Sequence, residues 1–348
     1  MVAALWIVLL ICVVWVALGE VPAGWDGRMP MPYLIAFLPF LWIPTLLISV
    51  VGFALHETGL GVVAAAICVA SLLRKVAYWS NNLESHNTAQ MVAEKIAKKR
   101  ETTRETTRET NVDKSAESAR NGRFRVMTLN CRFGRANAEN IVAAVKQHDV
   151  AVLALQELTN DLIESLREAG LDELLPYRQL GECKDTDNGG FNGVWIRVEP
   201  SDMSPVTAVI PAADVPGVCF PIDSMRSITF VSAHPKSPMR GCREWSVGII
   251  GLSELASTQK DGDITVILGD LNSGTGHPSF RKLLSAGFKD AALVDARGRH
   301  ATFPSWVTWP RIILDHILFT PGLTASEVSS FVVEGSDHLA LAATLTLK

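Results

Sequence analysis

The chain has 348 residues, a formal net charge of −4, and 48% hydrophobic residues. A strongly basic balance would indicate binding to nucleic acid through its phosphates; this charge does not favour that mode, although it leaves room for a local basic groove. The whole-chain charge and hydrophobic fraction hide a difference between two parts of the chain. Residues 1–80 are apolar and almost uncharged, whereas the chain is polar from residue 83. We predict a transmembrane anchor at 1–80, a charged flexible linker at 81–121 and a globular domain at 122–348.

Three apolar stretches lie in the predicted anchor: Val2–Leu18, Tyr33–Leu55 and Gly59–Leu73. A membrane-spanning helix needs about 20 apolar residues. The second stretch is long enough, and its Pro39 and Pro44 are tolerable where neighbouring helices satisfy the backbone. We expect two to three transmembrane helices. A signal peptide for the first stretch, and a buried helix of a soluble domain for any one of them, are the alternatives.

The cations Arg74 and Lys75 follow the third stretch. This stretch reaches the length of a span only if it continues past them toward Trp79, with the long side chains extending to the membrane surface. The positive-inside rule places these cations, and the domain after them, in the cytoplasm. The N-terminus carries no opposing charge that would test this orientation. We therefore predict a multi-pass protein of the cell membrane, with the lipid bilayer as a partner. The side of the membrane on which the domain lies stays open, and the cations favour the cytoplasm.

The linker contains a period-four repeat, Arg-Glu-Thr-Thr, which starts at Arg100 and again at Arg104. Opposite charges three residues apart support a solvated helix by about 0.2–0.5 kcal/mol per pair. No apolar face accompanies the repeat, so nothing in the sequence docks it onto a core. A spacer is the simpler interpretation, and a contact with anionic lipid headgroups is the alternative.

The six cysteines show no zinc-site spacing, because none of them forms a C-x-x-C pair. Cys12 and Cys68 lie in apolar stretches and are expected to pack as small hydrophobic residues. One or two disulfides remain possible among the cysteines of the domain, which are Cys131, Cys183, Cys219 and Cys242.

Strands alternate with helices in the first part of the domain, and the last three strands follow one another directly. This mixture indicates an α/β sandwich with antiparallel pairs rather than a purely parallel sheet. Helices are predicted after Asn137 and Thr159, which can cap them, and at Arg243–Leu255 and Pro278–Ala286. The predicted strands are Phe124–Asn130, Asp149–Glu157, Gly193–Val198, Ser227–Ala233, Ile264–Leu268, Ile312–Phe319, Val328–Val333 and Leu339–Leu347.

Polar side chains recur at the ends of these apolar strands, where a rigid backbone can bring several of them together. Taken singly, an Asn is typical of a turn, a strand-terminal Glu can be solvated, and a His can be structural. Asp315 is harder to explain, since a charge inside an apolar strand needs a partner. The joint occurrence indicates a site formed by Asn130, Glu157, His234, Asp270, Asn272, Asp315, Asp337 and His338.

Six short motifs carry these residues: Thr128-Leu129-Asn130, Leu155-Gln156-Glu157, Ser232-Ala233-His234, Gly269-Asp270-Leu271-Asn272, Leu314-Asp315-His316 and Ser336-Asp337-His338. At these separations they resemble the endonuclease/exonuclease/phosphatase superfamily, which has the DNase I-like fold. The resemblance covers essentially all of 122–348 and none of 1–121. It implies a four-layer α/β sandwich and a site for Mg²⁺ or Mn²⁺.

The resemblance implies that Glu157 is the principal metal ligand, with Asn130 beside it and Asp337 completing the metal side. Oxygen ligands of this kind suit Mg²⁺ independently of any family. The sequence departs from some DNA-repair members, which carry an acidic residue where this chain has Arg132. The number of metal ions therefore stays open, and the lack of a long basic insertion weakens a nuclease in particular.

The resemblance also assigns the reacting groups. Asp270 positions or deprotonates the attacking water, and Asn272, like Asn130, contacts the substrate by holding a phosphate oxygen. His338 stabilises the developing negative charge and is oriented by Asp315, while His234 contacts the phosphate or the leaving oxygen. A metal with an imidazolium is also the device that physical chemistry requires, because a phosphodiester repels hydroxide.

We therefore predict a membrane-anchored, divalent-metal-dependent phosphoester hydrolase of phosphodiesterase or nuclease type. Its substrate would be nucleic acid or a phospholipid headgroup, since fold alone does not decide substrate. No protein partner is predicted. The alternative is a catalytically inactive, membrane-tethered binding module of the same fold; a channel or transporter is disfavoured by the shortage of ionisable residues in the apolar stretches.

Overall fold

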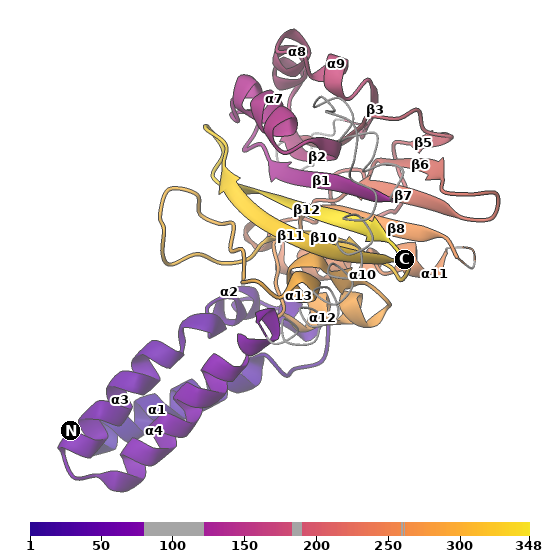
Figure 1. Cartoon of the computed structure of the whole chain (residues 1–348). Helices are drawn as coiled ribbons and strands as arrows, with labels where there is room; N and C mark the ends of the chain where they lie inside the picture. Colours follow the sequence, from indigo (N-terminus) through magenta and orange to yellow (C-terminus); the bar gives the residue numbers. More distant parts are fainter. Residues whose placement is uncertain (80–121, 183–189, 259, 261) are drawn as a thin grey trace, which may run out of the picture.

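The computed structural model describes residues 1–79, 122–182, 190–258, 260 and 262–348. A helical bundle formed by the N-terminal residues projects from an α/β domain formed by residue 122 onward (Figure 1). The predicted linker and Cys183 lie outside the described residues. Among the described cysteines, Cys131, Cys219 and Cys242 are free thiols.

Three helices of the bundle lie side by side: α1 (Val2–Leu18), α3 (Trp42–Ala54) and α4 (Thr58–Leu73) (Figure 1). The backbones of α3 and α4 touch, because a Cβ added at Gly52 would lie 2.8 Å from the backbone nitrogen of Gly61. Small residues at such contacts allow close helix packing in membranes. Short helical turns lie at the end of the bundle next to the domain: η1 (Trp25–Gly27), α2 (Met31–Ala36), η2 (Leu38–Phe40) and η3 (Val76–Tyr78).

The stretch predicted as one long span is broken. Helical structure at Met31–Phe40 and at Trp42–Ala54 is bent by 56° at the break. The break lies between Phe40 and Trp42. Pro39 is in the 3-10 turn before it and Pro44 is in α3 after it, and neither proline has an N–H for the helical hydrogen bonds. The third stretch does continue past the cations, because Thr58–Tyr78 is helical over 21 residues and is long and apolar enough to cross a membrane. Within the described residues, one helix can span a membrane by length and composition, or two if the bent pair counts as one span.

The domain contains two six-stranded mixed sheets. The first has the order β11-β12-β1-β2-β4-β3, in which β1 and β2 are parallel. Its strands are β1 (Arg123–Asn130), β2 (Val150–Leu158), β3 (Tyr177–Leu180), β4 (Phe191–Ile196), β11 (Leu323–Val332) and β12 (Leu339–Leu347). The second has the order β5-β6-β7-β8-β10-β9, in which β7 and β8 are parallel. Its strands are β5 (Asp202–Ser204), β6 (Gly217–Pro221), β7 (Ser227–Ser232), β8 (Ile264–Asp270), β9 (Lys289–Asp290) and β10 (Asp315–Phe319).

Alternating side chains of the strands divide the core into layers. In β1, Val126 packs between the sheets with Phe230 and Leu268, whereas its neighbour Met127 faces the helices outside the first sheet. Those helices are α7 (Ala138–Gln147), α8 (Asn160–Glu168) and α9 (Leu171–Leu174). The second sheet is covered by α10 (Cys242–Gly251), α11 (Glu254–Ser257) and α12 (Pro278–Ser285), while α13 (Ala291–Asp295) packs beside β10 and β11.

Most predicted elements occur within a few residues of their expected bounds, and Asn137 and Thr159 both cap helices through their side chains. Three boundaries differ. The strand predicted from Val328 begins five residues earlier, at Leu323, as β11. The strand predicted from Ile312 begins at Asp315, because Ile312 only bridges to Phe303. The helix predicted near Arg243–Leu255 is two helices, α10 and α11. Four short strands escaped prediction, since they are too brief to show a period of two: β3, β5, β6 and β9.

The bundle is joined to the domain by buried polar contacts. The Asp26 carboxylate, which is 0% exposed, accepts hydrogen bonds from the Ser279 backbone N–H at 2.8 Å, the Ser279 hydroxyl at 2.6 Å and the Gly24 N–H at 3.0 Å. His277 lies 2.9 Å from the Pro32 carbonyl oxygen, and Tyr78 bonds to the Thr275 hydroxyl at 3.1 Å. These contacts fix the end of the bundle against the segment between β8 and α12.

Asp26→Ala is expected to loosen this joint. It leaves the Ser279 N–H buried without an acceptor, which costs about 1–3 kcal/mol. The amide of Ser279 should then exchange with solvent roughly tenfold faster or more in the full chain. The control is Glu199→Ala, which removes an exposed carboxylate from the domain. Unchanged exchange in the Asp26 variant would mean that the joint does not depend on this carboxylate.

Candidate active site

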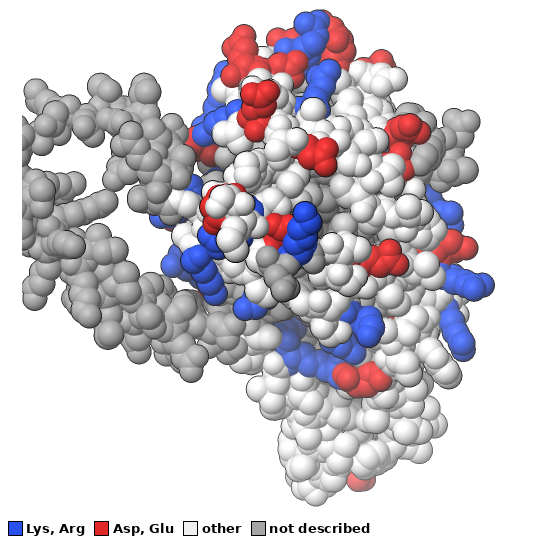
Figure 2. Space-filling model, turned by 90° about the vertical axis from the view of Figure 1, so that its right-hand side faces the viewer, with Lys and Arg blue, Asp and Glu red and all other residues white. Residues whose placement is uncertain are grey.

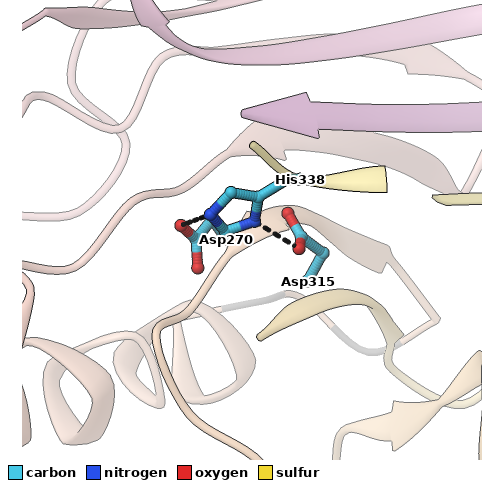
Figure 3. Close-up of side chains that lie close together, drawn as sticks. All are labelled: Asp270, Asp315 and His338. Atoms are coloured by element: carbon cyan, nitrogen blue, oxygen red, sulfur yellow. Dashed lines mark hydrogen bonds and ion pairs between the residues drawn. The ribbon is translucent and has the colours of Figure 1, made fainter. Parts of the chain in front are cut away.

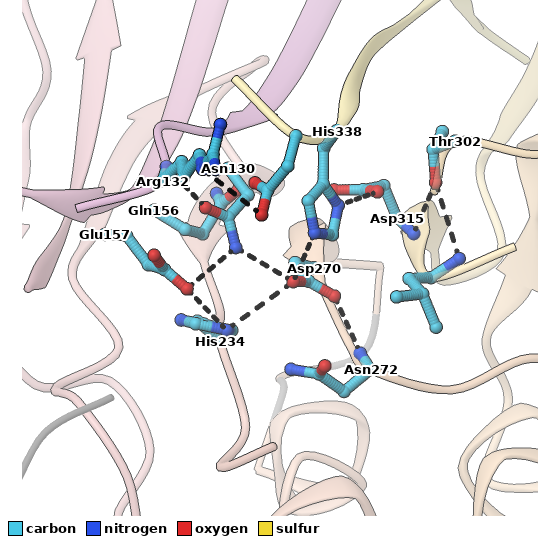
Figure 4. A network of polar contacts seen from close by, with 12 residues as sticks. Asn130, Arg132, Gln156, Glu157, His234, Asp270, Asn272, Thr302, Asp315 and His338 are labelled. Carbon is cyan, nitrogen blue, oxygen red and sulfur yellow. Dashed lines mark hydrogen bonds and ion pairs between the residues drawn. The ribbon is translucent and has the colours of Figure 1, made fainter. Parts of the chain in front are cut away.

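The residues predicted from strand ends meet at one edge of the two sheets (Figure 4). The parallel pairs β1–β2 and β7–β8 bring their carboxyl ends to this edge, so Asn130, Glu157, His234 and Asp270 converge there. The antiparallel pairing of β10 with β8 places Asp315 opposite Asp270. Sheet topology therefore gathers side chains that are more than a hundred residues apart in sequence.

Asn130 links two carboxylates. Its Nδ2 donates to Glu157 Oε1 at 3.1 Å and to Asp270 Oδ2 at 3.0 Å. Its Oδ1 accepts the backbone N–H of Arg132 at 2.8 Å. The N–H contact fixes which end of the amide is oxygen, since only an oxygen can accept it. In this structure Asn130 orients both carboxylates, and its Oδ1, which has a second lone pair, keeps capacity for a metal or a substrate group.

Glu157 lies in β2, where the register of the pairing with β4 shifts between Leu155 and Leu158. Its φ is +54°, and Arg132 and Phe133, which face it, also have positive φ values, of 48° and 53°. Non-glycine residues in this region carry strain that functional sites often retain. Glu157 Oε2 accepts the Phe133 N–H at 2.9 Å, and the side chain is 13% exposed. The carboxylate is thus held in one orientation while part of it still reaches the surface.

Three buried side chains near Glu157 form a chain of close polar contacts (Figure 3). His338 Nδ1 lies 2.8 Å from Asp315 Oδ2, and His338 Nε2 lies 3.6 Å from Asp270 Oδ2. Burial alone would lower the pKa of the His338 imidazole, but the Asp315 and Asp270 carboxylates outweigh it and raise the pKa to about 10. The two carboxylates therefore favour the protonated form of His338, and Asp315 orients the ring through its contact with Nδ1.

Potential ligand atoms of Asp270, Asp315 and His338 lie within 4.8 Å of one another, which by spacing alone could hold a metal ion. A metal-ligating His must be neutral, with one nitrogen free of a proton. Both nitrogens of His338 face carboxylates instead. The geometry therefore favours a hydrogen-bonded chain here, and leaves the more exposed carboxylates as the candidates for a metal.

The predicted metal-side carboxylate Asp337 is 25% exposed, and its Oδ2 lies 3.6 Å from Arg132 Nε. Arg132 occupies the position where the sequence lacks a second acidic residue. Its guanidinium partly neutralises the negative charge of the Asp337 carboxylate at the entrance of the site. Within the described residues, the partly exposed carboxylates of Glu157 and Asp337 offer oxygen donors to a cation.

His234 and Asn272 complete the predicted set. His234 Nε2 lies 3.5 Å from Asp270 Oδ2 and 3.9 Å from Glu157 Oε1. The Asn272 N–H donates to Asp270 Oδ1 at 2.8 Å, and its Nδ2 donates to the Pro235 carbonyl at 3.3 Å. Asp270 is thus surrounded by groups that fix both of its oxygens.

Two further residues, which were not predicted to have a role, support the site. Gln156 connects the sheets, because its Nε2 donates to the Ser232 hydroxyl at 2.9 Å. His316 lies 2.6 Å from Asp290 Oδ2 through Nδ1 and 2.8 Å from the Ser273 carbonyl through Nε2. Both partners of His316 are acceptors, so both of its nitrogens donate and the ring is an imidazolium. It holds the backbone directly after Asn272.

The pH dependence of stability should reveal this imidazolium. Burial would lower the pKa of His316, but the Asp290 carboxylate raises it above its usual 6.5. A raised pKa in the folded state contributes stability that is complete below about pH 6.5 and is lost as pH rises through the folded pKa. The thermal midpoint difference between wild type and His316→Gln should therefore be largest near pH 6 and should shrink at alkaline pH. A difference that is constant with pH would contradict a charged His316.

Comparisons with known proteins agree with the fold. The structure is similar to that of D. rerio TDP2 humanized by 14 mutations, with a TM-score of 0.53 at 16% identity over 65% of this chain and 99% of that one. It is also similar to D. rerio TDP2 complexed with single-strand DNA product, with a TM-score of 0.51 at 16% identity over 64% of this chain and 99% of that one. An endonuclease/exonuclease/phosphatase family protein from Leptotrichia buccalis gives a TM-score of 0.50 at 14% identity over 64% and 100%.

Identities this low establish a shared fold, and no curated protein matches the sequence. The sequence model of one family does match, over residues 127–338, which span every predicted site residue. The chain belongs to the Endonuclease/Exonuclease/phosphatase family.

Proposed function

We propose that the chain is a membrane-anchored, divalent-metal-dependent phosphoester hydrolase. The observation that carries the proposal is the Asp315–His338–Asp270 chain beside the Asn130–Glu157 pair at one sheet edge. It places a fixed cation next to oriented carboxylates, which is what a reaction that builds negative charge on a phosphate requires.

The residues at the mouth fit a hard divalent cation. Mg²⁺ is bound in proteins by one or two carboxylates together with water and substrate phosphate oxygens. Glu157 and Asp337 would hold it, since their carboxylates are the partly exposed acidic groups of the site. The chemistry supplied by a bound Mg²⁺ or Mn²⁺ would be neutralisation and polarisation of the phosphate.

The remaining roles belong to the chain's own side chains. Asp270, whose oxygens are fixed by Asn130 and Asn272, positions the attacking water and accepts its proton. The imidazolium of His338 stabilises the charge that develops on the phosphate. Asn272 and His234 contact phosphate oxygens. Preorganised donors of this kind act without reorganisation cost at the moment of reaction.

The apolar surface of the bundle supports attachment to a membrane. Large hydrophobic side chains point outward from all three long helices, and the lower lobe in Figure 2 is almost free of charge. Leu10 and Leu47 are each 62% exposed, and Val62 is 58% exposed. An apolar surface of this extent is typical of contact with lipid or with another protein. We propose lipid as the contact and, from the positive-inside rule, the cytoplasm as the side of the domain.

The substrate proposed is a phosphodiester, either of nucleic acid or of a phospholipid headgroup. The neighbour solved with single-strand DNA product supports the first choice. The bundle attached to the domain supports the second, because it would hold the site near a bilayer. An assay of both classes is therefore needed.

Asp270→Asn should lower metal-dependent hydrolysis by roughly 10²–10⁴-fold, as expected for loss of a proton acceptor. The full chain in detergent would be assayed with bis-p-nitrophenyl phosphate, single-stranded DNA and phosphatidylglycerol, each with Mg²⁺, Mn²⁺ or EDTA. Asp202→Asn, an exposed residue of β5, is the matched control and should keep full activity. Folded protein that hydrolyses none of these substrates would favour the inactive binding module.

A further inference from the structure

A cavity lies where the bundle meets the domain. Its volume is about 310 Å³, and it is formed by the end of α4, the turn Thr275–Gly276, α12 and the segment after α13. None of its lining residues belongs to the candidate active site. In Figure 2, Lys and Arg side chains gather at this boundary between the apolar lobe and the domain.

Four cationic side chains line this junction cavity against one acidic residue. Arg74, Lys75, Arg281 and Arg299 face Glu20. Glu20 pairs with Arg74 at 2.6 Å and with Arg281 at 3.8 Å. Two cations are then left without a carboxylate, which gives the cavity an excess of positive charge.

Lys75 and Arg299 are these two cations. Within the part of the chain that the structure describes, neither side chain has an ion pair or a hydrogen bond to a protein group. Lys75 instead lies over the Trp42 ring, 5.3 Å from its centroid. Burial lowers the pKa of the Arg299 guanidinium. Two neighbouring, half-buried cations are unfavourable without an anion.

An unsatisfied hydroxyl provides a separate indication. Ser71 lines the same cavity and is 4% exposed, and its Oγ has no hydrogen-bond partner within the described residues. Buried polar atoms are nearly always paired, so an unpaired one calls for a water or a ligand. A phosphate oxygen can accept both from this hydroxyl and from the adjacent cations.

The cavity lies at the height where lipid headgroups would be. α4 ends at Leu73, and the apolar surface of the bundle begins directly below it. Basic pockets at the ends of membrane helices bind anionic headgroups. We propose that the junction cavity binds the phosphate of an anionic phospholipid, held by Lys75, Arg299 and Ser71. This inference rests on the membrane attachment proposed above and does not require hydrolysis.

The test measures binding to the full chain in dodecyl maltoside, with EDTA present to prevent turnover. Dihexanoyl phosphatidylglycerol is titrated while the thermal unfolding midpoint is followed, because a ligand that binds the folded state raises it. Dihexanoyl phosphatidylcholine and inorganic phosphate are parallel titrations. We expect a saturable rise with phosphatidylglycerol that neither of the other two reproduces.

Variants locate the binding. Arg299→Gln and Lys75→Gln should each weaken it by about tenfold, as expected for loss of a hydrogen bond to a charged group. Arg297→Gln removes the same charge two residues away, where the side chain is 51% exposed and outside the cavity, and should have no effect. The ligand-free midpoint shows that each variant is folded.

Three results would overturn the inference. Equal responses to phosphatidylglycerol and phosphatidylcholine would show that the net charge of the lipid does not determine binding. An equal response to inorganic phosphate would show a site for free anions. Binding that survives in both cavity variants but is lost in Asp270→Asn would place the headgroup in the active site. Binding with no hydrolysis of any substrate would leave this inference standing while the proposed enzyme activity fails.

Discussion

The hydrogen bond between Asp315 and His338 is the interaction on which the rest of the candidate site depends. An aspartate in the interior of an apolar sandwich is unfavourable unless a partner accompanies it. His338 provides that partner and becomes a cation in return, with its second nitrogen turned toward Asp270. The same contact therefore reduces the cost of burying Asp315 and favours the positive charge on His338 that phosphate chemistry requires. Within the described residues Asp315 Oδ1 has no hydrogen-bond partner, so the cost of burying this carboxylate is not fully offset.

The loop after β8 connects the two parts of the molecule. At its start, Asp270 and Asn272 face the site, and His316 holds the Ser273 carbonyl from behind. A few residues later the same segment contacts the bundle through His277 and Ser279. The bundle is therefore packed against the segment that carries the reacting groups, and the domain's attachment does not rest on the linker alone. These side-chain contacts therefore fix the position of the bundle relative to the reacting groups.

Local sequence was sufficient for most strands and helices, because alternation and side-chain caps act over a few residues. The family motifs also determined which side chains would form the site. The second apolar stretch shows where an apolar pattern is insufficient: it is long enough for a span, yet its helical structure bends at a break between Phe40 and Trp42. The role of Asn130 was similarly hidden, since only the bend of the chain at Arg132 engages its oxygen.

By itself, then, the sequence determined the α/β class, the family and the set of polar residues at strand ends, because these are written in local periodicity and in short motifs. Only the tertiary structure decided what depends on contacts between distant segments. These include the imidazolium of His316 between Asp290 and Ser273, the docking of Asp26 on Ser279, and the junction cavity. Each joins residues far apart in the chain, and pairing of buried charges is decided by which surfaces meet rather than by neighbours in sequence.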